Sequence, residues 1–353
     1  MQKRIRAART MQKHPKMYPP AELAENSASP IECVHLAATT EREPSMQKQS
    51  KRPVKIGIDL MGHDNDPRSL LRDLQKISFQ SGIDLTLIGL PEYAAFASPF
   101  SYCSASETIE MHEAPLLAAR RKKDSSICVG LRLLKEHQID AFISAGNTGA
   151  LVGASKMILG MQPGHSRPAL LTLMPTENKP LAVLDVGANL EAKASHLVEF
   201  AFLGAEYQKE RGIERPTVGL LNIGTEPIKG TNELRDAYEL LKNQKNPPFE
   251  FVGNIEGSFA FKGNLDVLVA SGFMGNIFLK TSEGAAHFLL KELSHCIPQD
   301  VLKPYLKPLM KTMNYEEHPG AILAGVQGRV IKCHGSSGSQ SFVSAIETVI
   351  SST

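Results

Sequence analysis

Short apolar runs alternate with longer, helix-like stretches from residue 53 to the end of the chain. Apolar runs of about four to eight residues are typical of buried strands, and their alternation with helices is typical of a parallel sheet. The predicted strands are 54–59, 85–89, 141–144, 169–174, 181–185, 218–222, 249–253, 267–271 and 330–333. The predicted helices are 67–80, 126–137, 147–160, 194–211, 232–242, 276–296 and 340–350. No linker divides this stretch, so the pattern predicts one continuous α/β domain over 53–353.

Residues 1–52 have a different composition. Its first residues include several lysines and arginines and no acidic residue. Proline, serine, glutamine and glutamate follow, without a sustained apolar period. Such a segment buries too little apolar surface to fold, so we predict a disordered extension. Its basic start could be an organelle transit peptide, but the acids from Glu22 onward weaken that interpretation, and Met46 is an alternative start.

Composition narrows the class of protein. The 353 residues are 42% hydrophobic, enough for a large core, and a net charge of +2 argues against a protein that binds nucleic acid over a whole face. The five cysteines are scattered and never in C-x-x-C spacing, which favours neither disulfides nor a zinc site and fits a reducing cytoplasm. No run reaches the roughly 18 apolar residues that a membrane-spanning helix requires.

The sequence ISAGNTGALVG at 143–153 reads as a strand, a tight turn and a helix. Gly146 and Gly149 leave no side chain between the backbone and a ligand, and Asn147 or Thr148 can cap the following helix. Free N–H groups at a helix start bind anions, so this loop is suited to a phosphate or an oxyanion. For one loop alone, a capped turn that binds nothing is the more common structure.

Six predicted strands end in similar chemistry, with glycine beside Asp, Asn, Ser or His. In a parallel sheet the carboxyl ends of the strands share one edge, so we expect these loops to converge on one cleft, although turn chemistry alone remains the alternative. The candidate phosphate- or substrate-binding residues are Asp59, Gly62, Gly146, Asn147, Thr148, Gly149, Asp185, Gly187, Asn189, Lys193, Asn222, Gly224, His334 and Gly335.

Several catalytic motifs are absent from the sequence. It contains no P-loop, no G-x-G-x-x-G after the first strand, no H-E-x-x-H and no G-x-S-x-G, so nucleotide and zinc hydrolysis lose support, and no cofactor is predicted. The remaining groups bind and polarise an anion, which suits a reaction whose nucleophile arrives as a substrate. Besides the candidates above they include Asp64, Arg120, Arg121, Lys122, Lys123, Lys280 and Lys332.

The ordered motifs of 53–353 resemble the bacterial phosphate acyltransferases of glycerolipid synthesis, the PlsX family. That resemblance implies a three-layer α/β/α fold with a largely parallel, Rossmann-like sheet of the isocitrate/isopropylmalate dehydrogenase type. It does not extend to 1–52. The motifs are DLMGHD, RRKKDSS, SAGNTGAL, RPAL, LDVGAN, LLNIGTEPIKG, SGFMGNIFLKT and IKCHGSSGSQSF.

The resemblance implies that a long acyl chain passes from acyl carrier protein to inorganic phosphate, giving acyl phosphate. By the same resemblance, Lys229 would orient the phosphate and match its charge, and Asn276 would donate to the thioester oxygen as charge develops there. The alternatives are a solvated loop lysine for Lys229 and a helix N-cap for Asn276. Loss of one such donor typically costs on the order of 10²- to 10³-fold in rate.

Three positions depart from the family pattern D-x-M-G-G-D and D-G-F-T-G-N. His63 replaces a glycine, Ser271 an aspartate and Met274 a threonine. The last two changes remove a carboxylate and a hydroxyl beside Asn276, and this motivates an alternative, a non-catalytic scaffold that binds acyl carrier protein or lipid. His63 is more readily a turn histidine than a catalytic base. A second alternative, an NAD-dependent dehydrogenase of related fold, would require a dinucleotide loop and metal-binding aspartates that are not apparent.

Residues 301–313 form a basic amphipathic stretch within a predicted helical insertion at 284–315. Such a stretch can lie on an anionic membrane, while Pro304 and Pro308 equally suit a kinked core helix or a subunit interface. The family resemblance implies a homodimer associated peripherally with the membrane, with a downstream glycerol-3-phosphate acyltransferase as a possible partner. The basic cluster 120–123 is a candidate docking point for the acidic carrier protein, although most charge runs are solvated.

Overall fold

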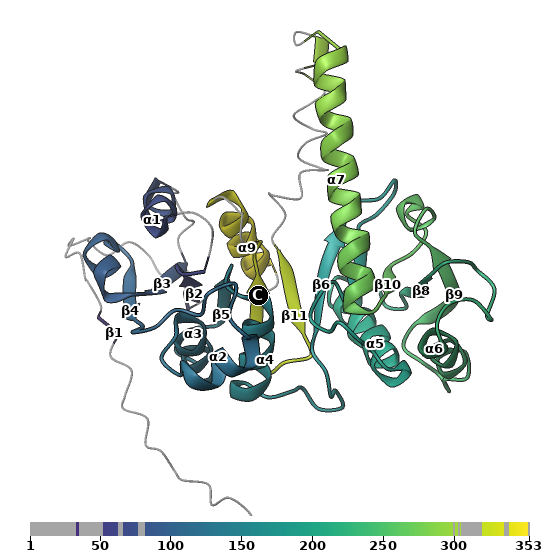
Figure 1. Cartoon of the computed structure of the whole chain (residues 1–353), viewed down its shortest axis with the longest axis horizontal. Coiled ribbons are helices and arrows are strands. Elements are labelled where there is room, and N and C mark those ends of the chain that lie inside the picture. The colour runs from purple at the N-terminus through teal and green to yellow at the C-terminus, as the bar shows by residue number, and fades with distance from the viewer. Residues whose placement is uncertain are drawn as a thin grey trace, which may run out of the picture. The chain divides into compact units, whose positions relative to one another are not determined.

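The computed structural model describes residues 33–34, 52–62, 66–76, 82–298, 301–302, 304, 320–334 and 339–351. Most of the predicted extension 1–52, together with His63, Asp64 and Gly335, lies outside these ranges. Of the amphipathic stretch 301–313, only 301, 302 and 304 are included. The described residues form one sheet of 12 strands with helices packed on it (Figure 1).

Every strand and helix predicted from the sequence is present, with ends that differ by a few residues. The strands are β1 (Cys33–Val34), β2 (Val54–Asp59), β3 (Ile83–Gly89), β4 (Ser101–Ser104), β5 (Ala141–Ser144), β6 (Ala169–Met174), β7 (Leu181–Leu184), β8 (Thr217–Asn222), β9 (Glu250–Glu256), β10 (Val267–Val269), β11 (Ala321–Ala324) and β12 (Arg329–Lys332). The helices are α1 (Pro67–Lys76), α2 (Pro115–Arg121), α3 (Ser126–Lys135), α4 (Thr148–Ile158), α5 (Ala194–Glu210), α6 (Asn232–Lys242), α7 (Gly272–Cys296) and α9 (Ser339–Ser351), with short 3-10 helices at η1 (Pro91–Phe96) and η2 (Ala260–Lys262).

The sequence pattern did not predict β1, β4, β11 or α2. Each is short: two residues in β1, four in β4 and β11, and seven in α2. Periodicity over so few residues is too weak to distinguish them from loops. Two residues of the extension expected to be disordered form β1, which pairs antiparallel with β4.

The sheet changes direction near its centre. Its strand order is β1-β4-β3-β2-β5-β12-β11-β6-β7-β10-β8-β9. Most pairs are parallel, but β11 is antiparallel to both β12 and β6, and β6 is antiparallel to β7. Consequently β7, β10 and β8 run opposite to β2, β5 and β12. The expectation that all six strand ends share one edge is therefore wrong. The two antiparallel pairings of β11 cancel, so β6 runs in the direction of β12, and the antiparallel pair of β6 with β7 reverses β7, β10 and β8.

Two buried clusters of described residues hold helices on one face of the sheet. One joins α1 and α9 to β2, β3, β5 and β12, and the other joins α5 and α6 to β6, β7, β8 and β10. Ile322 packs against the first cluster and Ala324 against the second. Residues two apart on a strand face the same side, so α9 and α5 cover the same face of the sheet. Helix α3 packs on the opposite face, where Phe142 lies against Gly130.

Helix α7 is 25 residues long (Figure 1), yet its buried residues are only Gly272, Gly275 and Ala286. Apolar side chains in its second half are exposed, for example Phe288 at 60% and Leu289 at 57%. The helix begins four residues before the predicted start at Asn276, because Ser271 caps it. Across the described ranges, no helix combines the length and the apolar character needed to cross a membrane.

Candidate functional site

A cavity of about 340 Å³ is lined by strand residues that face away from α5 and α9, and also by Cys333 and by Ser341 of α9. Leu171 and Ile331 pack toward those helices. Because side chains alternate along a strand, their neighbours Leu170, Thr172 and Lys332 face the other way, and all three line the cavity. Thr148 at the start of α4 and Asn276 on α7 also line it. The cavity therefore lies across the centre of the sheet, where the strand direction reverses.

A polar row crosses the sheet at the level of this cavity. Ser144 on β5 is paired in register with Lys332 on β12. One residue beyond the printed pairs, Asp59 on β2 lies next to Ser144, and Thr172 on β6 lies opposite Ala321 of β11. All of these side chains are on the face opposite α9 and α5. The row brings residues from strands far apart in the sequence to one surface.

The loops after β2 and β5 are locked together at the Asp59 end of the row. The hydroxyl of Ser144 donates to Oδ2 of Asp59 at 2.7 Å and accepts from the N–H of Gly146 at 3.0 Å. Gly62 has φ of +76°, and a Cβ placed on it would lie 2.6 Å from Cα of Gly146. Gly62 and Gly146 therefore allow the loops after β2 and β5 to pack closely against each other. Asp59 is buried and lies outside the cavity lining, so its role is to hold the loops in place.

Burial raises the pKa of Asp59 from 3.8 to about 6, and the Ser144 hydrogen bond opposes that rise. The folded chain then binds this proton more tightly than the unfolded chain, so the group stabilises the fold fully below about pH 4. That contribution, up to about 3 kcal/mol, is lost as the pH rises through about 6. We expect the wild-type advantage in unfolding free energy over Asp59→Asn, measured in urea at several pH values, to shrink over that window. A difference independent of pH would contradict the raised pKa.

The loop 144–149 is mainly a structural cap. Oδ1 of Asn147 accepts from the N–H of Ala150 at 3.1 Å, and its Nδ2 donates to the carbonyls of Glu110 and Met111, each at 3.2 Å. A Cβ on Gly149 would lie 2.8 Å from the ring of Pro115, so this glycine permits α2 to pack on α4. Of these loop residues, Thr148 is the one that lines the cavity.

The loop after β7 is organised by the buried carboxylate of Asp185. Oδ1 accepts the N–H groups of Leu170, Gly187 and Ala188 at 2.8–3.0 Å. Oδ2 accepts the backbone N–H of Asn189 at 2.7 Å and its side-chain amide at 2.9 Å. Burial raises the pKa of Asp185, and these hydrogen bonds oppose the rise. Asp185 and Asn189 therefore shape the loop, and of the candidates in it, Gly187 lines the cavity.

The first turn of α7 packs directly on that loop. A Cβ on Gly275 would lie 1.9 Å from the carbonyl oxygen of Asp185, so only glycine permits this approach. Ser271 caps the helix, its hydroxyl accepting from the N–H of Met274 at 3.4 Å. Serine is a good N-cap, so its replacement of the family's aspartate preserves the start of α7. Met274 packs against the second buried cluster.

Asn276 is not a helix N-cap, so the alternative role given for it above is wrong. It lies in the second turn of α7, lines the cavity and is exposed. Its side chain makes no hydrogen bond to any residue that the structure describes. A Cβ on Gly187 would lie 3.7 Å from its Oδ1, so Gly187 leaves room beside the amide. The amide is available to a ligand.

Lys229 follows β8, which runs parallel to β10, so its loop leaves the same sheet edge as the start of α7. The loop is closed by Asn222, whose Nδ2 donates to the Lys229 carbonyl at 3.2 Å and whose Oδ1 accepts from Ile223. Gly224 packs against the Lys229 methylenes. Lys229 is exposed and does not line the cavity, and neither does Lys193, which is exposed at the start of α5.

The end of β12 contributes Lys332 and His334 to the cavity lining. From the sequence, Lys332 is one of several cations and is not among the predicted binding residues. It is 8% exposed. The available signal was its position near the end of the predicted strand 330–333, shortly before the glycine- and serine-rich segment at 335–338.

The cavity combines a polar side with an apolar side. Lys332 and Thr172 lie on its floor, and Leu190, Phe273 and Ile277 form an apolar wall. These three side chains are 75%, 58% and 50% exposed, unusually high for large apolar groups. Such an arrangement can hold an anion at one end and an aliphatic chain at the other, with Asn276 on the same α7 turn as the apolar wall.

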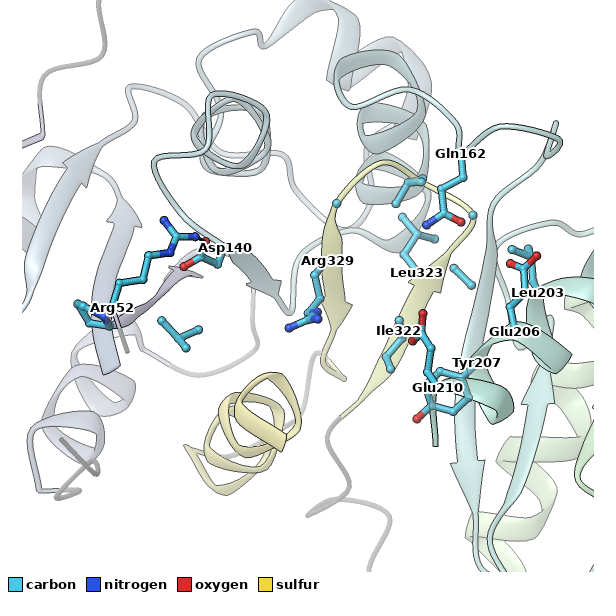
Figure 2. A pocket seen from close by; sticks show the side chains of 16 residues that line it. Arg52, Asp140, Gln162, Leu203, Glu206, Tyr207, Glu210, Ile322, Leu323 and Arg329 are labelled. Carbon is cyan, nitrogen blue, oxygen red and sulfur yellow. Dashed lines mark hydrogen bonds and ion pairs between the residues drawn. The ribbon is translucent and has the colours of Figure 1, made fainter. Parts of the chain in front are cut away.

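A second cavity, of about 530 Å³, lies elsewhere in the fold and contains none of the predicted site residues. Figure 2 shows Arg329 of β12 facing Glu206, Tyr207 and Glu210 of α5 across it. Arg52 lies at the far side and pairs with Asp140 at 2.5 Å. Charges of both signs line this cavity, so its chemistry does not select one class of ligand. Among the described residues, no three His, Cys, Asp or Glu side chains gather to hold a metal ion.

The family model and two relatives agree on one family. The family model described as "Fatty acid synthesis protein" matches residues 54–352. A phosphate acyltransferase of an Exiguobacterium species is 42% identical over 311 residues, covering 83% of this chain and 94% of that protein. Another, from Staphylococcus epidermidis, is 41% identical over 306 residues, with the same coverage of each chain. In fold, the chain is similar to a phosphotransacetylase from Streptococcus pyogenes, with a TM-score of 0.57, 19% identity and coverage of 85% of this chain and 94% of that one. The chain belongs to the phosphate acyltransferase (PlsX) family.

Proposed function

We infer that this chain is an acyltransferase that forms acyl phosphate from long-chain acyl-[acyl-carrier-protein] and inorganic phosphate, an early step of phospholipid synthesis. Family membership supports this reaction. The structural observation that carries it is the single cavity in which a buried lysine, an available amide and an exposed apolar wall meet. The lysine suits the anionic nucleophile, the amide suits the developing oxyanion, and the apolar wall suits the aliphatic chain.

The reaction needs positioning and electrostatic stabilisation more than proton transfer. A phosphate oxygen attacks the thioester carbonyl, a C–O bond forms, and the C=O electron pair moves onto the carbonyl oxygen. Asn276 donates an N–H to that oxyanion. When the carbonyl re-forms, the C–S bond breaks and the carrier leaves as its thiolate, which takes up a proton from water. Lys229, exposed on the neighbouring loop, supplies positive charge to the approaching phosphate.

The proposed organisation places the catalytic domain at 53–353 and the extension at 1–52. The fold subtype is that of the isocitrate/isopropylmalate dehydrogenases, with 284–315 as a protruding amphipathic insertion. We propose a homodimer in the cytoplasm that contacts the membrane through 301–313 and passes its product to a glycerol-3-phosphate acyltransferase. The exposed apolar residues of α7, such as Phe288 and Leu289, support membrane contact.

Binding of the acidic carrier protein is proposed at the basic cluster 120–123. There Arg120 and Arg121 are exposed at the end of α2. Lys122 is less available, because it pairs with Glu113 at 2.7 Å. Arg120 and Arg121 are therefore the cluster's best candidates for the carrier's acidic groups.

The proposal is tested by incubating the purified chain with acyl-carrier-protein thioester, with and without phosphate, and trapping the product with hydroxylamine. Acyl phosphate gives a hydroxamate, so phosphate-dependent hydroxamate is the expected result. Carrier binding without turnover would favour the non-catalytic scaffold, and reduction of NAD would favour the dehydrogenase. The non-catalytic alternative was motivated by the replacement of aspartate by Ser271. Because Ser271 still caps α7, the start of the helix that carries Asn276 is intact, and this favours catalysis.

Replacing Lys229 with alanine is expected to lower the rate of hydroxamate formation roughly tenfold. The ammonium group is exposed, and an exposed charge is worth only about 1 kcal/mol, close to the 1.36 kcal/mol of a tenfold rate change. Lys245→Ala, which removes another exposed lysine, is the matched control and should leave the rate unchanged. Equal rates for Lys229→Ala and wild type would remove Lys229 from the mechanism.

A further inference from the structure

We propose that Asn254 of β9 is a positioning residue that holds Lys229 in place through the loop that carries it. The inference rests on the role of Lys229 in the proposed function. Asn254 is 4% exposed, and its Nδ2 donates to the carbonyl of Glu226 at 2.9 Å. Glu226 belongs to the loop 223–230 between β8 and α6, which also contains Lys229. The Oδ1 of Asn254 is buried and meets no donor among the described residues, so the amide is costly to bury and its contact is with this loop.

The carbonyl that Asn254 binds is the one that fixes Lys229. The N–H of Lys229 donates to the same Glu226 oxygen at 3.1 Å, which closes a turn over 226–229. On its other side, the Lys229 carbonyl accepts from Nδ2 of Asn222 at 3.2 Å. Asn222 is 6% exposed, so both backbone groups of Lys229 are tied to buried amides of β8 and β9. The side chain of Lys229 therefore begins from a fixed backbone position, although the residue is exposed.

A β-bulge in β9 directs Asn254 toward this loop. Phe251 pairs with Val218 of β8, but the residue after Val218 pairs with Gly253. Val252 is therefore an extra residue in β9, and one extra residue moves the side chains that follow it to the other face of the strand. Asn254 consequently faces the same side as Phe251, which packs against the buried cluster that holds α6. Without the bulge, Asn254 would face away from α6 and from the loop that leads into it.

The bulge does not serve the packing of the core. Its extra residue, Val252, is 43% exposed, so it buries no further apolar side chain. Gly253 has φ of +91°, a conformation that glycine adopts readily and other residues rarely. Bulges are common next to active sites, where they re-aim a side chain. The effect of this bulge on the buried side of β9 is to re-aim Asn254.

Two further contacts support the same loop. Nη1 of Arg235 on α6 donates to the carbonyl of Gly230 at 2.9 Å, and Gly224 packs against the methylenes of Lys229. Arg235 is exposed, so water competes for its hydrogen bond, whereas the bond of Asn254 is buried. Because the loop is ordered before phosphate arrives, only the side chain of Lys229 has to be ordered when phosphate binds.

The test measures whether Asn254 acts through Lys229. Asn254→Leu in the full chain has a similar volume but no donor, and it should lower the initial rate of hydroxamate formation by about 3- to 10-fold. In the Lys229→Ala background the same change should have less than about a twofold effect, because the side chain that Asn254 positions is already absent. General destabilisation would lower the rate by the same factor in both backgrounds, and that result would overturn the inference.

Gln208→Leu is the matched control. Gln208 is 1% exposed, and its Nε2 donates at 2.6 Å to the carbonyl of Asp266, which also accepts the N–H of Ala182 at 3.0 Å. It is thus a buried amide on a shared carbonyl, as Asn254 is, but it contacts no residue of the loop 223–230. The Gln208 variant should keep the wild-type rate per folded molecule.

Amide hydrogen exchange tests the same contact without any reaction. The N–H of Lys229 should exchange at least about threefold faster in Asn254→Leu than in wild type, and equal exchange would overturn the inference. Where Asn254→Leu does not fold, Asn254→Ser, whose hydroxyl is one bond shorter than the amide, decides by the same two measurements. A wild-type rate for Lys229→Ala would overturn the role of Lys229 in the proposed function. Faster exchange in the Asn254 variant would still support Asn254 as the residue that holds its loop.

Discussion

Replacing Asn276 with alanine is expected to lower phosphate-dependent acyl transfer by about 10²- to 10³-fold, the usual cost of losing one donor to a developing oxyanion. The amide lines the cavity and has no other hydrogen-bond partner among the described residues. It is exposed on α7, so the change should alter the free energy of unfolding by less than about 0.5 kcal/mol. The measurement is the initial rate of hydroxamate formation alongside a urea unfolding curve.

Two further variants separate the amide's chemistry from its packing. Asn276→Asp has the same shape but places a carboxylate where negative charge develops, so it should be at least as slow as the alanine variant. Asn243→Ala, which removes an exposed amide at the end of α6, should be as active as wild type. Normal activity in both Asn276 variants would show that the thioester oxygen is stabilised elsewhere.

Replacing Gly275 with alanine is expected to destabilise the fold by about 3 kcal/mol, the upper part of the range for overpacking. The new Cβ would lie 1.9 Å from the carbonyl oxygen of Asp185, a backbone atom that five hydrogen bonds to the Asp185 carboxylate hold nearly fixed. The start of α7 must move away, taking Asn276 with it. Transfer activity should therefore fall even in the fraction that remains folded.

Gly284 provides the matched control on the same helix. A Cβ placed there meets nothing within 4 Å. Alanine in an exposed helix interior is favoured over glycine by about 1 kcal/mol, so Gly284→Ala should raise the urea midpoint. If the two alanine variants were equally stable, the close contact between α7 and the loop after β7 would be wrong.

The sequence predicted the strands and helices well, but it predicted the relative directions of the strands in the sheet poorly. Every predicted strand was found, because apolar runs report burial directly. The four-residue strand β11 carried too little pattern to be predicted. The pattern was interpreted as parallel strands joined by helices, whereas β6 and β7 follow each other closely and pair antiparallel, which sets β7, β8 and β10 opposite to β2, β5 and β12. Both groups of strands contribute residues to one cavity, although their carboxyl ends lie at opposite edges of the sheet.

Turn chemistry explains which candidate residues proved structural. Asn147, Asn189 and Asn222 all use their amides to cap a helix or close a loop. The same residue types suit ligand binding and turn formation, so composition alone could not separate them. Asn276 and Lys332 are distinguished by burial and by the direction of their side chains, which depend on tertiary packing. For that reason the sequence placed Lys332 among the cations without assigning it a site.

Two separately packed bodies contribute to the lining of the candidate cavity. Lys332 is anchored in the body built on β2, β5 and β12, and Asn276 in the body built on β7, β8 and β10. Among the described strands the two bodies meet at β11, whose Ile322 packs on the first core and Ala324 on the second. A lesion in β11, which itself contributes Ala321 to the cavity lining, would therefore shift the two sides of the cavity relative to each other while leaving each core intact.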